Sequence, residues 1–131
     1  MKTIVSTPEA PAAVGPYSQA AVAHGVIYAS GQIPLTPAGE LVRGSIADEV
    51  RQVMQNLQAV LAAAGAGFGD VVSVRIYLTD IGLFKDLNAV YASYFADGQP
   101  PARETVGVQS LPLGARVEIS VVALRAQPET V

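Results

Sequence analysis

The sequence predicts an α+β domain in which two helices pack on one face of a mixed β-sheet of about six strands. Three observations support this fold class. Short runs of β-branched or alternating apolar residues recur along the chain, two longer segments have helical periodicity, and the elements mix in the order β-β-β-α-β-α-β-β. With 131 residues, half of them apolar, the chain can bury a core, and we expect a single domain over residues 1–131.

Three strands are expected before the first helix. Residues 3–5 are a short β-branched run, and a loop with three prolines follows over residues 7–16. Two apolar segments, residues 20–23 and 26–30, are separated by a His-Gly pair that suits a two-residue turn. These segments predict one short strand followed by an antiparallel hairpin.

The two helices are predicted from apolar periodicity and from end signals. Ser45 is a good N-cap with acidic residues in the turn that follows, and apolar residues then recur with helical spacing until Gly65, which is placed to end the helix. A second helix is expected over residues 82–96, capped by Asp80 and stopped by Gly98 and two prolines.

Three further strands complete the predicted sheet. They are expected over residues 71–78, 105–108 and 115–124. The residues expected to share one face of the first of these are Val72, Val74, Ile76 and Leu78. This alternation predicts a strand with one apolar face against the helices.

One face of the last strand has a mixed composition. It carries Glu118, Ser120, Val122 and Leu124, a set too apolar for free solvent and too polar for a core. Only 15% of the residues are charged, which is few for the surface of so small a domain. Both observations favour an oligomer in which subunits pack sheet against sheet around a shared axis.

The composition argues against several classes of function. The net charge is −3 and the Lys and Arg residues form no basic run, so nucleic acid is a poor partner. The chain has no cysteine and its single histidine is His24, so we expect neither a metal site nor a His-dependent triad. We also expect that the function requires no organic cofactor. No apolar stretch approaches the length of a membrane span, and we expect a soluble cytoplasmic protein without membrane contact.

Arg103 is the first candidate site residue. Pro100 and Pro101 stiffen the chain before it and remove two backbone donors, so Arg103 begins an extended segment from a fixed direction. An arginine held in this way presents a planar, permanently charged fork of N–H donors that matches a carboxylate or a phosphate. The alternative is a solvated arginine at the end of a strand.

Glu118 is the second candidate. It stands between Val117 and Ile119 in a strongly β-forming run, and its carboxyl group projects from the sheet. Either it forms an ion pair with Arg116 or Arg75, or it is a partly desolvated carboxylate that holds or deprotonates a water molecule.

We expect Arg103 and Glu118 on adjacent strands, where one would bind an anion and the other would handle water and protons. Two further segments add candidates. Tyr17 follows a proline that fixes the backbone before it, and its hydroxyl can donate or accept a hydrogen bond. Gly31, beside Ser30, has no side chain and lets a ligand approach the main chain closely. Asn88 lies near the apolar stripe of the second helix and is either a structural amide or a ligand contact.

At these residues the chain resembles the Rid family of reactive intermediate deaminases, also called the YjgF or endoribonuclease L-PSP family, and it is close to the archetypal RidA subfamily. The matching blocks are Ala12-Ala13-Val14-Gly15-Pro16-Tyr17, Ser30-Gly31-Gln32-Ile33-Pro34, Leu87-Asn88-Ala89-Val90-Tyr91, Pro101-Ala102-Arg103 and Val117-Glu118-Ile119. The resemblance implies a fold like that of the trimeric bacterial chorismate mutases and sites between the subunits of a homotrimer. It also implies a hydrolase that converts 2-iminopropanoate and 2-iminobutanoate, or their enamine tautomers, to 2-keto acids and ammonia.

The resemblance assigns roles to single residues. Arg103 matches the arginine that binds the substrate carboxylate, and Glu118 matches the glutamate that positions the hydrolytic water. The residues that match the lining of the substrate pocket are Tyr17, Ser30, Gly31 and Asn88. Thr105 stands where archetypal members usually carry a cysteine whose backbone N–H helps to hold the carboxylate; the N–H is retained, whereas the branched hydroxyl leaves the substrate preference open.

Three other functions stay open at this point. The same pocket could bind a keto acid or an amino acid as a regulatory module without turnover, and Glu118 alone separates this reading from an enzyme. A deaminase of a larger enamine, such as 2-aminomuconate, is compatible with Thr105. Ribonuclease activity, an older label in this family, is disfavoured by the acidic charge and by the lack of a histidine that could act as general base.

Overall fold

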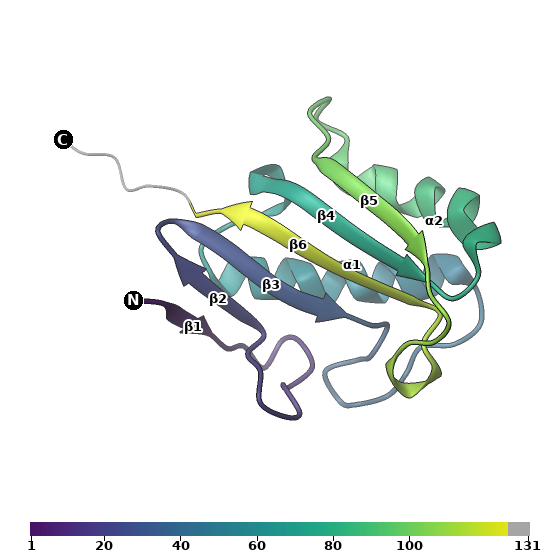
Figure 1. The fold of residues 1–131 in the computed structure, drawn as a ribbon, viewed down its shortest axis with the longest axis horizontal. Helices are drawn as coiled ribbons and strands as arrows, with labels where there is room; N and C mark the ends of the chain where they lie inside the picture. The colour runs from purple at the N-terminus through teal and green to yellow at the C-terminus, as the bar shows by residue number, and fades with distance from the viewer. Residues whose placement is uncertain (126–131) are drawn as a thin grey trace.

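The computed structural model describes residues 1–125, and the order of its elements is the expected one (Figure 1). The bounds are β1 Thr3–Val5, β2 Ala20–Ala23, β3 Val26–Gln32, α1 Ile46–Ala63, β4 Val71–Leu78, α2 Phe84–Tyr91, β5 Ala102–Gly107 and β6 Val117–Leu124. All six strands form one sheet in the order β1-β2-β3-β6-β4-β5. Only β4 and β5 run parallel, and the other neighbours are antiparallel. The predicted α+β class is confirmed.

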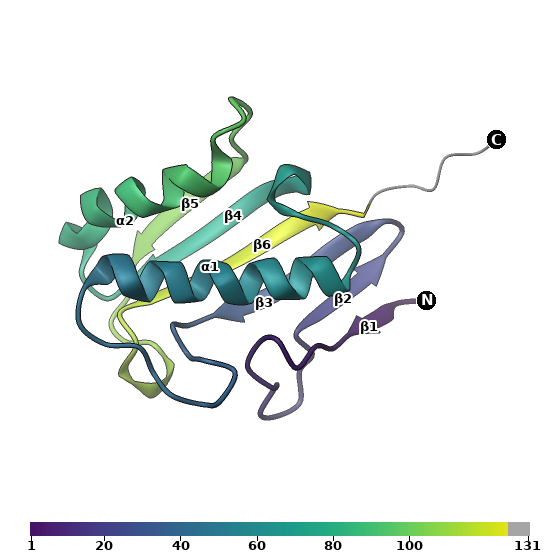
Figure 2. The same ribbon diagram turned by 180° about the vertical axis from the view of Figure 1, so that it is seen from behind.

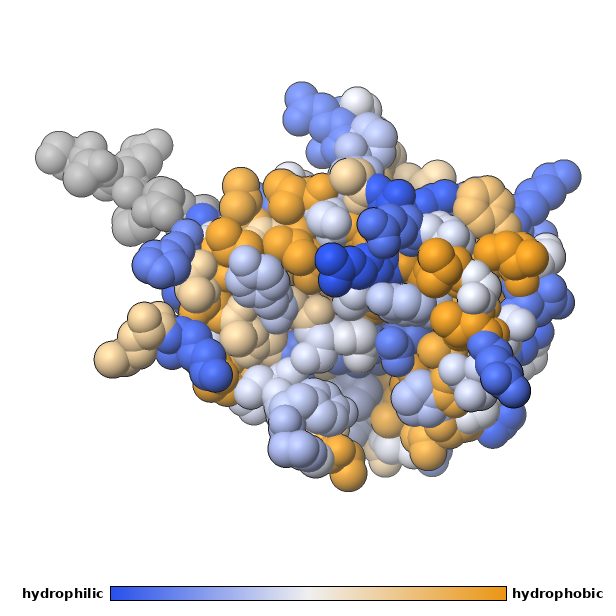
Figure 3. All heavy atoms as spheres, in the orientation of Figure 1, coloured by the Kyte–Doolittle hydropathy of each residue, from blue (hydrophilic) through white to orange (hydrophobic). Residues whose placement is uncertain are grey.

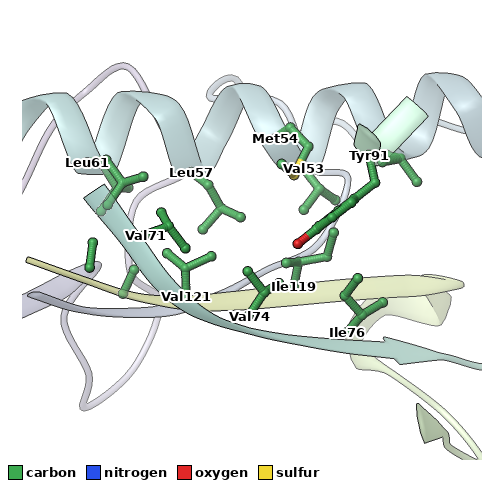
Figure 4. Close-up of a cluster of buried hydrophobic side chains, with 14 of the residues drawn as sticks. Val53, Met54, Leu57, Leu61, Val71, Val74, Ile76, Tyr91, Ile119 and Val121 are labelled. Atoms are coloured by element: carbon green, nitrogen blue, oxygen red, sulfur yellow. The ribbon is translucent and has the colours of Figure 1, made fainter. Parts of the chain in front are cut away.

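Both helices lie on one face of the sheet, as Figure 2 shows from the helix side. The core fills the layer between them and the sheet, where Met54, Leu57 and Leu61 of α1 are fully buried. Figure 4 shows these side chains above the inward residues of β4 and β6, among them Val74 and Ile119. Burial of a Leu or Met side chain contributes about 1.5–3 kcal/mol, so this layer supplies most of the driving force for folding.

The first helix begins and ends as its signals predict. The Ser45 hydroxyl accepts a hydrogen bond from the Asp48 N–H at 3.1 Å, which satisfies one of the free donors of the first turn. Gly65 has φ +84°, a left-handed conformation that L side chains rarely adopt, and it lies just beyond the C-cap.

The second helix is shorter than predicted. Asp80 accepts from the Gly82 N–H at 2.9 Å, but it caps a 3₁₀ turn, Ile81–Leu83, and not an α-helix. The α-helical part covers only Phe84–Tyr91, and a second 3₁₀ turn, Ala92–Phe95, follows it. The spacing of the aromatic residues does not distinguish one long α-helix from a short α-helix with 3₁₀ turns at its ends. In both cases, residues three or four positions apart lie on the same side of the segment.

A β-bulge changes the predicted faces at the start of β4. The pairing of β4 with β6 is irregular between Val71 and Ser73, so Val71 is buried and Val72 is exposed. From Val74 onward the predicted alternation holds, and Ile76 is buried against the helices. The expectation that Val72 shares the inward face is therefore wrong, because the extra residue reverses the side on which it points.

The face of the sheet opposite the helices is open in the single chain. Figure 3 shows apolar and polar side chains interspersed over it. The apolar residues that are exposed there include Tyr28, Val72 and Leu124, while Glu118, Ser120 and Val122 are partly buried. This composition agrees with the mixed face predicted for the last strand.

Candidate active site

Arg103 lies between β5 and α2. The parallel register pairs Arg103 with Val74, and its side chain shares the helix-covered face with that buried valine. One guanidinium nitrogen, Nη1, donates to Oδ1 of Asn88 at 2.7 Å. The guanidinium carbon lies 5.3 Å from the centre of the Phe84 ring and 4.9 Å from that of Tyr91. Arg103 is thus a fixed, partly buried cation and not a solvated strand end.

The charge of Arg103 is not neutralised by a carboxylate within the described chain. Over residues 1–125 the salt bridges join Arg51 to Asp48 and Arg116 to Glu49. Arg103 instead has a neutral amide acceptor and two aromatic rings. Because these neighbours are neutral, the positive charge of Arg103 can still attract an anion. A carboxylate that accepts two parallel hydrogen bonds is the anion that fits the guanidinium group best.

The backbone beside Arg103 offers a second donor. Just after β5, the Val108 N–H donates to the Leu78 carbonyl at 2.8 Å. Successive residues of a strand direct their N–H groups to opposite sides, so the N–H of Thr105 points away from β4. Since β5 is the last strand of the sheet, that N–H faces an open edge.

The Thr105 hydroxyl is not at this open edge. Its Oγ1 is buried and has no hydrogen-bond partner among the described residues. In the register of β5, Thr105 pairs with Ile76, whose side chain is buried under the helices. The Thr105 side chain therefore contributes to the layer behind the site more than to the edge itself.

Glu118 lies on the other face of the sheet. Its neighbours in β6, Val117 and Ile119, are buried under the helices, so the Glu118 side chain points to the open face. No residue of the described chain forms a salt bridge with it, and Arg116, one of the partners considered for it, binds Glu49 instead. Burial raises the pKa of the Glu118 carboxyl above its ordinary value. A carboxyl group of this kind can exchange protons with a bound water.

Gly31 lies against the Glu118 side chain at a bulge in β3. Ala29 pairs with Val121 and Gln32 with Ile119, so three steps along β3 face two along β6. The extra residue places Ser30 and Gly31 in the bulge. A Cβ built on Gly31 would come 2.8 Å from Oε2 of Glu118, so only glycine fits there without displacing the carboxyl group.

Ser30 connects Glu118's neighbourhood to the loop that carries Tyr17. The Ser30 hydroxyl donates to the Ser18 carbonyl at 2.6 Å, and the Ser30 N–H donates to the Gln19 carbonyl at 2.9 Å. Tyr17 itself is 54% exposed, and its phenolic oxygen accepts from the Val14 N–H at 3.4 Å. These hydrogen bonds hold the loop in place, while the Tyr17 side chain remains exposed to solvent.

The predicted site residues thus form two groups. We call Arg103, Asn88 and Thr105 the arginine half-site, and Glu118, Gly31, Ser30 and Tyr17 the glutamate half-site. The expectation that Arg103 and Glu118 lie on adjacent strands is wrong, because β4 separates β5 from β6 and the two side chains are on opposite faces. Within the described chain, the Arg103 and Glu118 side chains therefore do not converge on one pocket.

Two surface hollows of the described chain keep the predicted site residues apart, since Tyr17 lines a hollow beside β1 that contains neither Arg103 nor Glu118. A hollow of about 710 Å³ between the start of α1 and α2 is lined by neither Arg103 nor Glu118. Within residues 1–125, no group of three or more His, Cys, Asp or Glu side chains could hold a metal ion.

None of the helices in the described chain combines the length and apolar character that crossing a membrane requires.

Two kinds of contributor were missed from the sequence. The first is a pair of aromatic rings, Phe84 and Tyr91, whose spacing to Asn88 places all three residues on one side of α2. The second contributor is Gln19, which is buried and whose side chain bonds to the backbone of Thr7, Ala10 and Pro11. The first could be found from helical spacing, whereas the second has no sequence signal.

Comparison with known proteins identifies the class to which this fold and site belong. The family model described as Endoribonuclease L-PSP matches residues 7–125. A mouse protein named 2-iminobutanoate/2-iminopropanoate deaminase is 43% identical over 126 residues, which cover 95% of this chain and 93% of the mouse protein. The chain belongs to the endoribonuclease L-PSP family, which is also called the Rid family, and the resemblance drawn from the sequence is confirmed.

Solved structures agree with this assignment. YyfA from Yersinia pestis, described as a protein of unknown function of the conserved Rid family, superimposes with a TM-score of 0.93 at 46% identity and covers 95% of this chain and 99% of that chain. TdcF from E. coli, solved with bound serine, gives a TM-score of 0.88 at 35% identity and covers 95% of this chain and 99% of that chain.

Proposed function

We propose that the chain is a cofactor-independent deaminase that hydrolyses 2-iminopropanoate, 2-iminobutanoate or their enamine tautomers to 2-keto acids and ammonia. The observation that carries this proposal is the pairing of chemistries in the two half-sites: an unneutralised guanidinium for a carboxylate, and a carboxyl group with a raised pKa for water and protons. The name of the mouse relative supports the substrate class, and the serine bound by TdcF supports recognition of an α-carboxylate.

The complete site would form between two copies of the chain in a homotrimer. Arg103 lies at the open edge strand of the sheet and Glu118 on the open face, so the edge of one subunit placed against the face of the next would bring them together. The partly apolar open face and the low content of charged residues support such packing.

The reaction adds water to a C=N bond and needs little chemistry from the protein. The carboxylate of the substrate would bind the Arg103 fork and the Thr105 N–H, and the Gly31 carbonyl would accept from the substrate nitrogen. Glu118 would take a proton from water as its oxygen adds to the imine carbon. It would give that proton to the nitrogen, which yields a carbinolamine. It would next move the proton of the new hydroxyl group to the nitrogen as well, so that the C–N bond breaks, a C=O bond forms and ammonia leaves. Tyr17 would close the site against bulk water.

Mixed oligomers test both the residues and their arrangement. We expect Arg103→Ala to remove the acceleration of imine hydrolysis, and Glu118→Gln to retain binding of 2-ketobutyrate while losing rate. Co-expression of the two inactive variants should restore activity, because a site that takes Arg103 from one chain and Glu118 from another is then intact. Random assembly of equal amounts restores about one quarter of the sites.

The control is co-expression of Arg103→Ala with the double variant Arg103→Ala/Glu118→Gln, since that mixture contains no intact arginine half-site. No recovery in the first mixture would contradict a site shared between chains. Wild-type turnover in either single variant would remove that residue from the mechanism. Keto-acid binding by a wild-type protein without imine hydrolysis would support the regulatory module instead.

A further inference from the structure

We propose that Phe84 and Tyr91 are positioning residues that hold the Arg103 guanidinium in the orientation needed for a carboxylate. This inference deepens the proposed function and rests on it, because it concerns how the arginine half-site binds its anion. Neither residue is required to touch the substrate. Their role is exerted through Arg103.

The geometry of α2 places three contacts on one side chain. Phe84, Asn88 and Tyr91 follow one another at spacings of four and three residues, so they share one side of the helix. That side faces Arg103 with two ring centres, at 5.3 Å and 4.9 Å from the guanidinium carbon, and one amide oxygen at 2.7 Å from Nη1. One short helix therefore fixes both the position and the rotation of the cation.

Asn88 and the two aromatic rings contact the Arg103 guanidinium in different ways. Asn88 accepts one N–H of the guanidinium, which carries five such donors, and most of the fork stays available. The rings attract the cation through their π-electrons within the usual range of about 6 Å and use none of its N–H groups. A long arginine side chain held in this way loses less conformational freedom when the carboxylate arrives, so binding is stronger.

Tyr91 contributes its ring and not its hydroxyl. The residue is buried, and its hydroxyl has no hydrogen-bond partner among residues 1–125. Burial raises the pKa of Tyr91, and the charge of Arg103 together with the approach of its guanidinium group to the phenol opposes this shift only in part. The phenol thus stays neutral. Because no hydrogen bond of acceptable geometry joins its oxygen to Arg103, Tyr91→Phe tests the ring apart from the oxygen.

The experiment compares loss of a ring with loss of its hydroxyl. Phe84→Leu and Tyr91→Leu remove the rings, whereas Phe84→Tyr and Tyr91→Phe retain them. Phe95→Leu is the matched control. The centre of the Phe95 ring lies 4.8 Å from that of Tyr91 and 5.5 Å from that of Phe68, but the Phe95 ring is not one of those that contact the Arg103 guanidinium. Affinity for 2-ketobutyrate is measured by calorimetry, and KM and kcat are measured separately with freshly generated 2-iminobutanoate.

We expect each Leu variant at positions 84 and 91 to weaken keto-acid affinity and to raise KM by about two- to thirtyfold, with a smaller change in kcat. The ring-retaining variants and Phe95→Leu should keep wild-type affinity. Phe84 is partly exposed, so Phe84→Leu tests the proposal even if Tyr91→Leu fails to fold.

Wild-type affinity and KM in Phe84→Leu would overturn the inference and leave the proposed function intact, as would an equal loss of affinity in Phe95→Leu. A wild-type protein that neither binds the keto acid nor hydrolyses the imine would contradict the proposed function and this inference together.

Discussion

The backbone of Gly31 lies directly against the carboxyl group of Glu118. A Cβ at position 31 would approach Oε2 to 2.8 Å, the carboxyl carbon to 2.9 Å and Cγ to 3.0 Å. These distances are shorter than ordinary contacts between carbon or oxygen atoms. The glycine thus sets where the glutamate can lie, and a bulge in β3 brings it there.

We expect Gly31→Ala to lower kcat strongly while the fold persists. The new methyl group must push the Glu118 carboxyl aside, and a misplacement of about 1 Å at a reacting group can cost on the order of a hundredfold in rate. Gly69→Ala is the matched control, because nothing lies within 4 Å of a Cβ at that glycine. Equal imine hydrolysis by the two variants would separate Gly31 from the reaction.

Replacing Asn88 by aspartate should create an internal competitor for the substrate. The Oδ1 that accepts from Arg103 would become a carboxylate oxygen, and the resulting ion pair would offset the charge that binds the substrate. We expect KM and the dissociation constant of 2-ketobutyrate to rise at least tenfold in Asn88→Asp. Asn88→Ala removes the anchor without adding charge and should lose less affinity. Tighter binding in Asn88→Asp than in Asn88→Ala would contradict this account.

The stability of the protein should depend on the ionisation of Glu118. Because burial raises the pKa of this carboxyl in the folded chain, the folded state holds the proton more firmly than the unfolded state does. Stability from this group is therefore complete below the pKa of the unfolded chain and decreases as the pH rises toward the raised pKa. Glu118→Gln should be more stable than the wild type at neutral pH and equally stable in acid, as measured by urea denaturation at both pH values.

The reaction should show the same group in its rate. A glutamate that accepts a proton from water is inactive when protonated, so the acid limb of kcat/KM should lie above the ordinary range of a glutamate. An acid limb at the usual carboxyl pKa would indicate that burial in the complete site differs from that in the single chain.

Thr105→Val is expected to keep activity and to maintain or raise stability. Valine has nearly the shape of threonine and removes a buried hydroxyl without a partner, a group whose burial costs roughly 1–3 kcal/mol. The Thr105 N–H is retained, so kcat/KM for small imines should not change. Thr36→Val is the control that should lose stability, because the Thr36 hydroxyl accepts from the Glu40 N–H at 3.1 Å. A fall in kcat/KM in folded Thr105→Val would mean that the hydroxyl contacts the substrate.

Most helices and strands of this fold could be predicted from the sequence because the features that define them depend on residues close together in the chain. The Ser45 cap, the left-handed Gly65 and the alternation of β6 each depend on a few consecutive residues. The exposure of Val72 could not be predicted in this way, since a bulge depends on how β4 meets β6 and leaves no mark in the alternation of one strand.

The relative placement of Arg103 and Glu118 depends on which strands are neighbours, and alternation within a strand does not contain that information. One signal was available. A strand, a helix and a following strand favour a parallel crossover pair, and this pairing places β5 beside β4. The roles of Ser30 and Gln19 in fixing the Tyr17 loop arise from contacts between residues about 8 to 12 positions apart, which no periodic pattern reveals.

A strand edge with unpaired backbone donors normally invites another β-strand and leads to aggregation. In β5 the features that discourage such pairing also serve the site: Pro100 and Pro101 remove donors at its start, and the charges of Arg103 and Glu104 disfavour a neighbouring strand. The edge can hold a small anion only while no strand occupies it. Any quaternary arrangement compatible with ligand binding must therefore leave a gap beside β5 that admits a metabolite but is too narrow for a polypeptide.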